Sequence, residues 1–345
     1  MRAWQVTRYG RPSEALALAE VPTPRPGPLE ILVRTSASVC NYNEVDGCHG
    51  RYLTVNPPLP YTLGMEFVGE VIATGPGAES WMGRRVMGSG TGAVGAHAEQ
   101  VVGPMAMAFD VPPELDDIEA AAFYYPFHLA YLGLHERGRL QVGESVLVHA
   151  AAGGVGSAAV QLAVAAGARV IATAGTAEKL AVARRMGADI AVDYRASGFA
   201  DAVLDATDGK GVDVCFDGVG GSVTTQSLRC LARNGRHLVV GFAAGIEAEE
   251  VPMVAGRALC FGNISLMGVL LAYRDSPMPV GSGFNPTPRS VGDSVHEHLV
   301  TLLRAGRIHP LVGKSVPFEQ LPLALEDMEE RQTIGGVVVH IQAPT

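Results

Sequence analysis

The sequence is short of cysteine, of positive charge and of long apolar runs, and each shortage excludes a class of protein. The five cysteines among 345 residues are odd in number and scattered, so we expect reduced thiols in a cytoplasmic protein and no disulfide framework. The formal net charge of −9 argues against a nucleic-acid partner, whose phosphates require a basic face. No apolar run reaches membrane-spanning length and no secretory signal is evident, so a membrane partner is not expected either.

The first third of the chain reads as β-rich and irregular. The ranges 1–8, 30–37 and 68–74 have the pattern of short strands, and glycine and proline punctuate them. Prolines alternate over 22–28, which suits an extended connector and excludes a helix there. We therefore expect a β-rich domain at this end of the chain.

From residue 145 the pattern changes to short apolar strands that alternate with helices. A helix over 114–137, with Pro126 as a kink or break, leads into this region. Strands separated by helices predict a parallel sheet covered on both faces. After about residue 262 we expect a loop over 273–289, a helix over 291–305 and a closing strand over 335–341. The expected strands are 145–149, 169–174, 190–193, 212–217 and 237–241, and the expected helices are 157–166, 178–186 and 199–207.

The sharpest motif lies between the first of these strands and the first helix. It reads Ala150-x-x-Gly153-x-x-Gly156, a variant of the dinucleotide-binding glycine pattern. Glycines allow a tight turn, the close approach of a pyrophosphate and the close packing of helix on strand. The helix N-terminus, expected at Ser157, presents free N–H groups to the phosphates. The alternative is a glycine-rich turn without a ligand, which leaves the run of small residues before Val155 unexplained.

The end of the second strand favours NADPH over NADH. Sites for NAD carry an Asp or Glu there that bonds the adenosine ribose, but residues 172–176 contain no carboxylate. Lys179, in the first turn of the next helix, can pair with a 2′-phosphate, and Tyr194 and Arg195 can reach the same group. The alternative for Lys179 is an ordinary exposed lysine.

These motifs resemble the quinone oxidoreductases of the medium-chain dehydrogenase/reductase superfamily. The resemblance runs along nearly the whole chain and implies a doubly wound Rossmann domain inside a GroES-like β-rich catalytic domain built from both chain ends. The expected boundaries are 1–118 for the first part of the catalytic domain, 119–265 for the Rossmann domain and 266–345 for the return to the catalytic domain. The matching segments are 150–156, 174–176 with Lys179, 187–189, 192–195, 213–220, 60–64 and 303–339.

The resemblance also implies residue roles, a homodimer and a small-molecule substrate. Asn41 and Tyr52 would line the substrate pocket. Gly154 and Val155 would meet the pyrophosphate, Lys179 and Tyr194 would hold the 2′-phosphate end, and Gly241 with Phe242 would lie near the nicotinamide. The full set expected to bind NADPH is Ala151, Gly153, Gly154, Val155, Gly175, Lys179, Tyr194, Gly220, Gly241 and Phe242.

No metal is expected. Zinc relatives in this superfamily need a Cys, a His and a third Cys or Asp, and Cys40 stands where the first ligand would be. Met65 replaces the His of the second ligand motif, and residues 123–126 offer no Cys for the third. A catalytic zinc usually takes three protein ligands. Cys40 and Cys48 are therefore interpreted as semi-buried apolar filler.

Without a metal, hydride transfer must rely on positioning and on hydrogen-bond donors. The expected acceptor is a quinone or an α,β-unsaturated carbonyl. Tyr52 is the candidate proton donor, with a wall residue as its alternative, and Asn41 would orient the carbonyl. Enoyl reductase relatives carry a catalytic Tyr near Asp46, which would be a poor donor when ionised. A packed, structural histidine is the expectation for His97.

Three other functions stay open. The first is an enoyl-thioester reductase for CoA- or carrier-linked substrates, for which Arg274 and Arg289 can form a basic rim. The second is a low-turnover NADPH-binding protein, and the third is a zinc alcohol dehydrogenase.

Overall fold

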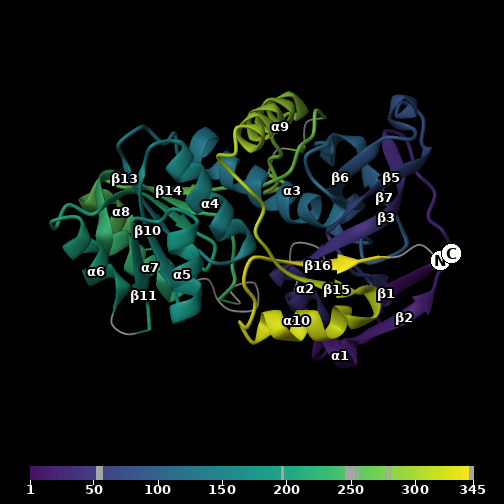
Figure 1. Ribbon diagram of the computed structural model, residues 1–345, viewed down its shortest axis with the longest axis horizontal. Coiled ribbons are helices and arrows are strands. Elements are labelled where there is room, and N and C mark those ends of the chain that lie inside the picture. Colours follow the sequence, from purple (N-terminus) through teal and green to yellow (C-terminus); the bar gives the residue numbers. More distant parts are fainter. Residues whose placement is uncertain are drawn as a thin grey trace. The chain divides into compact units, whose positions relative to one another are not determined.

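The computed structural model describes residues 1–51, 57–195, 198–244, 254, 256–276, 278–279 and 281–341. The chain divides into two units, whose elements are labelled in Figure 1. Unit 1 comprises Met1–Tyr125, Ala272–His296 and Pro310–Thr345, and unit 2 comprises Pro126–Leu271 and Glu297–His309. The boundaries expected at 118/119 and 265/266 stay a prediction. Among the described residues, no helix combines the length and the apolar character needed to cross a membrane.

Unit 1 is built on two β-sheets of described strands. In the smaller one, β1 (Arg2–Val6) lies between β2 (Leu16–Glu20) and β4 (Tyr61–Thr62). The larger has the order β15-β16-β3-β5-β6-β8, with β7 also paired to β3. Strand β16 pairs antiparallel with β3, which confirms that both chain ends build this β-rich domain. The strands are β3 (Glu30–Cys40), β5 (Glu66–Thr74), β6 (Arg85–Ser89), β7 (Gln100–Pro104), β8 (Ala108–Asp110), β15 (Val312–Pro317) and β16 (Gly336–His340).

Three helices of unit 1 pack around a core shared by the two chain ends. They are α1 (Pro12–Ala15), α2 (Tyr42–Cys48) and α10 (Leu321–Glu329). The buried cluster includes Trp4, Val45, Phe318, Leu325 and Val337. The Trp4 Nε1–H donates to the Phe318 carbonyl oxygen at 2.8 Å, so the indole is buried with its polar atom satisfied.

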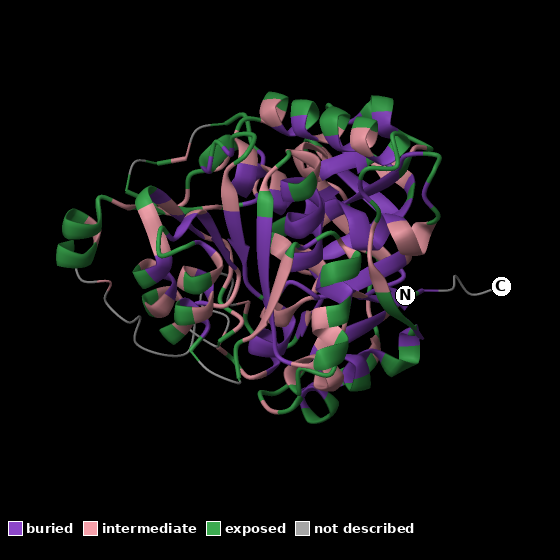
Figure 2. Cartoon of the chain, turned by 60° about the vertical axis from the view of Figure 1, so that its left-hand side comes forward, coloured by how far each residue is buried: buried purple, intermediate pink, exposed green. Residues whose placement is uncertain are grey.

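Unit 2 contains a parallel sheet whose described strands have the order β11-β10-β9-β12-β13-β14. This order reverses between β9 and β12, as in doubly wound folds, and confirms the predicted Rossmann sheet. Buried residues follow the inner strands β9, β10 and β12 and much of α4, whereas β14 at the edge of the sheet is mostly exposed; Figure 2 colours the chain by burial. The elements are β9 (Ser145–Val148), α4 (Gly154–Ala165), β10 (Arg169–Ala174), α5 (Ala177–Arg185), β11 (Ile190–Asp193), α6 (Phe199–Ala206), β12 (Val212–Asp217), α7 (Ser222–Ser227), β13 (Leu231–Val239), α8 (Gly256–Gly262) and β14 (Ser265–Gly268).

Several expected boundaries are wrong. Helix α4 begins at Gly154 and not at Ser157, because the motif glycines already adopt helical backbone. Strand β13 begins at Leu231 instead of 237, and β14 lies in a stretch for which no strand was expected. Pro126 does not break α3 (Asp117–Tyr131), which continues as a π-helical turn over Leu132–Arg137. Helix α9 (Arg289–Arg304) starts two residues earlier than expected.

Candidate functional site

The glycine turn after β9 presents three amides at the start of α4. The Gly153 N–H donates to Ala150 O at 2.9 Å, which closes the turn. The first intrahelical bond runs from Ser157 N to Gly153 O at 2.9 Å, so the amides of Gly154, Val155 and Gly156 precede it. Amides in this position have no intrahelical acceptor and attract anions. The amides without an intrahelical acceptor therefore precede Ser157, the residue at which the helix was expected to begin.

The close packing of this turn depends on Gly156. A Cβ built on Gly156 would lie 2.2 Å from Ala150 O and 2.9 Å from Ala151 Cα, both of them backbone atoms. The Ala151 N–H also donates to Thr173 O at 3.1 Å, which ties the turn to β10. The turn therefore has no room for a side chain at this point, as a pyrophosphate-binding motif requires.

The turn after β10 gathers the residues expected at the 2′-phosphate. Thr176 caps α5, since its Oγ1 accepts from Lys179 N at 3.1 Å. A Cβ on Gly175 would lie 2.8 Å from the Tyr194 hydroxyl oxygen, so the Tyr194 ring packs directly on that glycine. Tyr194 remains 40% exposed. Asp193 lies opposite Ala174 in the sheet, and its carboxylate accepts from Arg195 N at 2.9 Å.

The segments after β12 and β13 lie against one another. A Cβ on Gly241 would lie 3.2 Å from Gly218 O, and the Ala243 N–H donates to that oxygen at 3.2 Å. Gly220 has a φ of +81°, a conformation that favours glycine. Phe242, expected near the nicotinamide, is 40% exposed. Because β9, β10, β12 and β13 are parallel, all these turns lie at the same edge of the sheet, where doubly wound folds bind ligands.

A buried carboxylate that the sequence did not single out holds the turn after β12. Asp217 Oδ1 accepts from the N–H groups of Val219 at 2.8 Å and Gly220 at 3.0 Å. Its Oδ2 accepts from Thr224 Oγ1 at 2.6 Å and bonds His237 Nε2 at 3.1 Å. Burial alone would raise the pKa of Asp217. The bonds from His237 and Thr224 and the nearby histidine charges outweigh burial and hold the pKa well below its usual range.

His149 is a second buried polar group beneath these turns. Its Nδ1 bonds Thr173 Oγ1 and its Nε2 bonds Ser227 Oγ, both at 2.8 Å. Burial lowers the pKa of His149 to about 4, although the charge of Asp217 opposes that shift. The residue therefore joins β9, β10 and α7 as a neutral imidazole.

We expect His149→Gln to flatten the acid limb of the stability profile. Between about pH 6.5 and 4 the unfolded histidine binds a proton that the folded one does not, so stability falls with falling pH by up to roughly 1.4 kcal/mol per pH unit. Glutamine cannot titrate and removes this contribution. Thermal midpoints at half-unit steps from pH 7 to 4.5 test the prediction. Equal pH dependence in the wild type and the variant would contradict it.

In unit 1, the side chain of Asn41 donates to the buried carboxylate of Glu66, and its backbone N–H belongs to the cap of α2. Asn41 Nδ2 donates to Glu66 Oε1 at 2.8 Å, and Asn41 N donates to Glu44 Oε2 at 3.1 Å in a capping box on α2. Glu66 is 2% exposed, and its Oε2 has no partner among the described residues. Burial raises the pKa of Glu66 well above its usual value, against the bond from Asn41. Tyr52 lies outside the described residues.

Two further residues considered from the sequence are engaged in packing. Asp46 is 1% exposed and lies 3.1 Å from Arg51 Nη2; burial raises its pKa, and the Arg51 charge opposes the rise. Arg289 donates to the carbonyl oxygens of Met105 and Ala108 at 2.8 and 2.7 Å and lies over the Phe109 ring at 4.0 Å. Arg289 therefore anchors the 273–289 segment, which weakens its expected use as a basic rim for a thioester.

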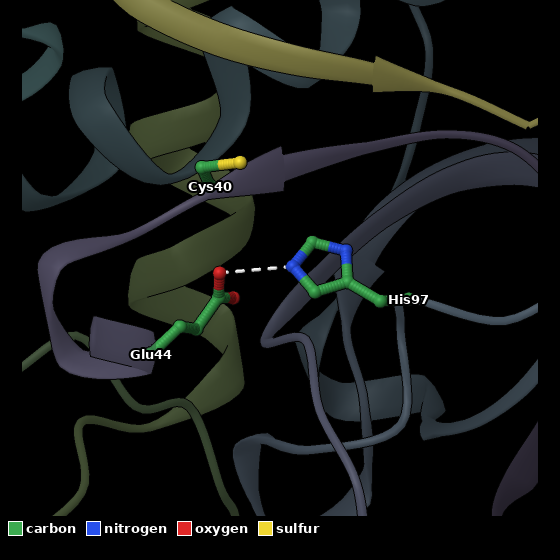
Figure 3. A group of neighbouring side chains, drawn as sticks. All are labelled: Cys40, Glu44 and His97. Atoms are coloured by element: carbon green, nitrogen blue, oxygen red, sulfur yellow. Dashed lines mark hydrogen bonds and ion pairs between the residues drawn. The ribbon is translucent and has the colours of Figure 1, made fainter. Parts of the chain in front are cut away.

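The fold also gathers three potential metal donors, of which Cys40 and His97 were considered separately from the sequence and Glu44 was not considered. Cys40, Glu44 and His97 come from the end of β3, from α2 and from the segment before β7 (Figure 3). Met65, at the second expected zinc position, is buried, and neither it nor the residues 123–126 at the third offer a thiolate or an imidazole. The only hint of this group in the sequence was the Asn41-x-x-Glu44 capping pattern, which predicts that Glu44 turns back toward β3.

Comparisons with known proteins cover both units. Residues 27–113 match the family described as "Alcohol dehydrogenase GroES-like domain", and residues 154–279 match "Zinc-binding dehydrogenase". The mouse "Quinone oxidoreductase-like protein 2" is 33% identical over 333 residues, which are 95% of this chain and 90% of the relative.

Solved structures with the same fold extend along the whole chain. A mycobacterial protein solved in complex with NADPH has a TM-score of 0.85 at 30% identity and covers 99% of both chains. The JamJ enoyl reductase, solved in its apo form, has a TM-score of 0.83 at 27% identity and also covers 99% of both chains.

Proposed function

This chain belongs to the quinone oxidoreductase family of the medium-chain dehydrogenase/reductase superfamily, and from that membership we propose that it is an NADPH-dependent reductase. Its acceptor is a quinone or an α,β-unsaturated carbonyl, and no metal ion takes part at the reacting atoms. The observation that carries the proposal is the turn at 150–156, whose amides before the first intrahelical hydrogen bond start α4 beside the point where the strand order reverses.

The residues at the end of β10 support the phosphorylated cofactor. Gly175 leaves room for the Tyr194 ring, and Lys179 lies in the first turn of α5, the helix that Thr176 caps. The only nearby carboxylate on the paired strand, among the described residues, is that of Asp193, and Arg195 bonds it. Lys179 as the cation, together with an Asp193 carboxylate whose charge Arg195 balances, favours a 2′-phosphate over a free ribose hydroxyl.

In the proposed reaction, the protein orients the acceptor and supplies a proton. Bound NADPH supplies the hydride, and the protein must then stabilise the oxyanion or enolate that forms on the acceptor. Tyr52 is the proposed proton donor, with Asn41 orienting the carbonyl. Asn41 is itself held by Glu66 and by the capping box, so its position is fixed before an acceptor binds. The homodimer and the three domain ranges are further proposals from the same resemblance, and the cytoplasmic location is a proposal from the scattered cysteines.

A second candidate is reduction of an enoyl thioester. The similarity to the JamJ enoyl reductase over the whole chain favours it. The acceptor chemistry is the same, hydride addition to the β-carbon of a conjugated carbonyl, so the two candidates differ in what the carbonyl is attached to. Because Arg289 packs on Phe109, it is less available to bind a thioester substrate, which favours the quinone or unsaturated carbonyl as the acceptor.

The proposal is tested by NADPH oxidation with matched quinones, enals and enoyl-CoA thioesters. We expect turnover with the first two classes. Turnover with the thioester alone would assign the second candidate. If NADPH binds but no acceptor oxidises it, the protein is a low-turnover cofactor binder and the proposed activity is wrong.

We expect Lys179→Ala to separate the two nicotinamide cofactors. Loss of a charged partner for the 2′-phosphate should raise the KM for NADPH about tenfold or more and leave the KM for NADH nearly unchanged. Lys210→Ala is the matched control, since Lys210 is an exposed lysine before β12, at the opposite edge of the sheet. Equal changes for NADPH and NADH would remove Lys179 from the cofactor site.

A further inference from the structure

Cys40, Glu44 and His97 place a sulfur, a carboxylate oxygen and an imidazole nitrogen within 4.8 Å of one another. The three residues are 5%, 2% and 0% exposed. Figure 3 shows their side chains directed into one space from three separate segments. These are the three donor types that zinc takes in proteins. A buried cluster of this kind differs from the exposed acidic groups that are common on protein surfaces.

The outer atoms of two of these side chains are held by neighbours. His97 Nδ1 bonds Ser38 Oγ at 2.8 Å, and Glu44 Oε1 accepts from Met65 N at 2.9 Å. As a result, His97 Nε2 and Glu44 Oε2 face each other at 2.9 Å. Metal-binding histidines typically bond a second partner through the other ring nitrogen, which fixes the ring and its tautomer. Here Ser38 supplies that partner.

We propose that Cys40, Glu44 and His97 bind one zinc ion that has a structural role. The Cys40 thiol gives up its proton to solvent, and the sulfur then binds the ion as a thiolate. His97 binds through Nε2 with its ring proton on Nδ1, where Ser38 Oγ accepts it. One thiolate and one carboxylate balance the two positive charges of the ion, which makes the buried site neutral. The second oxygen of Glu44 or a water molecule completes four-coordination.

The proposed ion has a structural role and takes no part in the proposed hydride transfer, but its site borders Asn41, whose N–H donates to Glu44 Oε2 at 3.1 Å. Its ligands are buried within unit 1, so the ion holds α2 to the end of β3 and to the segment before β7. The expectation of no metal considered the superfamily's catalytic ligand positions, where Met65 and the residues 123–126 provide no donor. The zinc proposed here shares Cys40 with those positions, but its other two ligands, Glu44 and His97, lie outside them.

The test uses the full chain, freed of metal with a chelator and then titrated with Co²⁺. Wild-type protein should bind one equivalent and develop thiolate-to-cobalt charge-transfer absorption. Cys40→Ser should lose that absorption and weaken Zn²⁺ binding on the order of 100-fold, while keeping the His97–Glu44 bond and the fold. Cys48→Ser is the matched control: Cys48 is equally buried on α2 but lies outside the group, and this variant should behave as wild type.

The stability readout is separate from activity. Stoichiometric Zn²⁺ should raise the melting temperature of the wild type and of Cys48→Ser, but not that of Cys40→Ser. Wild-type protein that takes up no cobalt, or Cys40→Ser that binds it as wild type does, would show that the group is only a buried His–Glu hydrogen bond beside a thiol.

Discussion

Gly156→Ala should abolish tight NADPH binding. The added methyl would lie 2.2 Å from Ala150 O, 2.8 Å from Ala150 C and 2.9 Å from Ala151 Cα, and these backbone atoms cannot rotate away. The turn must therefore open or α4 must move off β9, and either change disperses the amides of Gly154 and Val155. We expect a loss of about 3 kcal/mol in stability and a rise in the Kd for NADPH of at least about 100-fold.

Gly268→Ala is the control for this prediction. A Cβ on Gly268 meets no atom within 4 Å, and the residue is in β14, away from the turn. Its stability and NADPH affinity should stay near wild type, within about 0.5 kcal/mol. Titration calorimetry and thermal melts on both variants give the comparison. Wild-type affinity in Gly156→Ala would mean that the cofactor does not depend on this turn.

Removing the Asp217 carboxylate should have the second-largest effect on stability and NADPH affinity. Asp217→Ala leaves the N–H groups of Val219 and Gly220 and the buried His237 without their acceptor. Each buried donor that is left without its acceptor costs about 1–3 kcal/mol of stability. Asp217→Asn keeps the shape and one acceptor oxygen, so it should fold with a smaller loss and still raise the Kd for NADPH about tenfold, because Gly220 is less firmly held.

Asp213→Asn is the control that shows whether a loss of NADPH affinity comes from the turn after β12 or from general destabilisation of that strand. Asp213 lies at the other end of β12, where its carboxylate accepts from the N–H and hydroxyl of Ser145 at 2.8 Å. This variant should lose stability without a change in NADPH affinity. If Asp213→Asn and Asp217→Asn weaken NADPH equally for equal losses of stability, Asp217 has no particular part in holding the turn.

Local sequence signals predicted the centre of the Rossmann sheet well. The expected strands 169–174, 190–193 and 212–217 coincide with β10, β11 and β12, because each is a short apolar run bounded by charged residues or glycine. The start of α4 was misplaced because glycine is a poor helix former, yet Gly154 and Gly156 already belong to the helix.

Contacts between distant segments were beyond sequence reasoning. Asp217 and His237 are 20 residues apart and meet because β12 and β13 are neighbours in the sheet. Glu44 and His97 are 53 residues apart. A carboxylate in a sequence reads as exposed by default, and only the fold shows that Glu44, Glu66 and Asp217 are buried. The roles expected for Tyr52 and Asn41 stay predictions.

The central claim is that a nicotinamide dinucleotide phosphate binds at the turn between β9 and α4. Titration calorimetry of the purified chain with NADPH, and with NADH under the same conditions, tests it most directly. We predict saturable binding of one NADPH per chain, with an affinity at least about tenfold higher than for NADH. A flat titration with both cofactors would contradict the account, whatever activity the protein then proved to have.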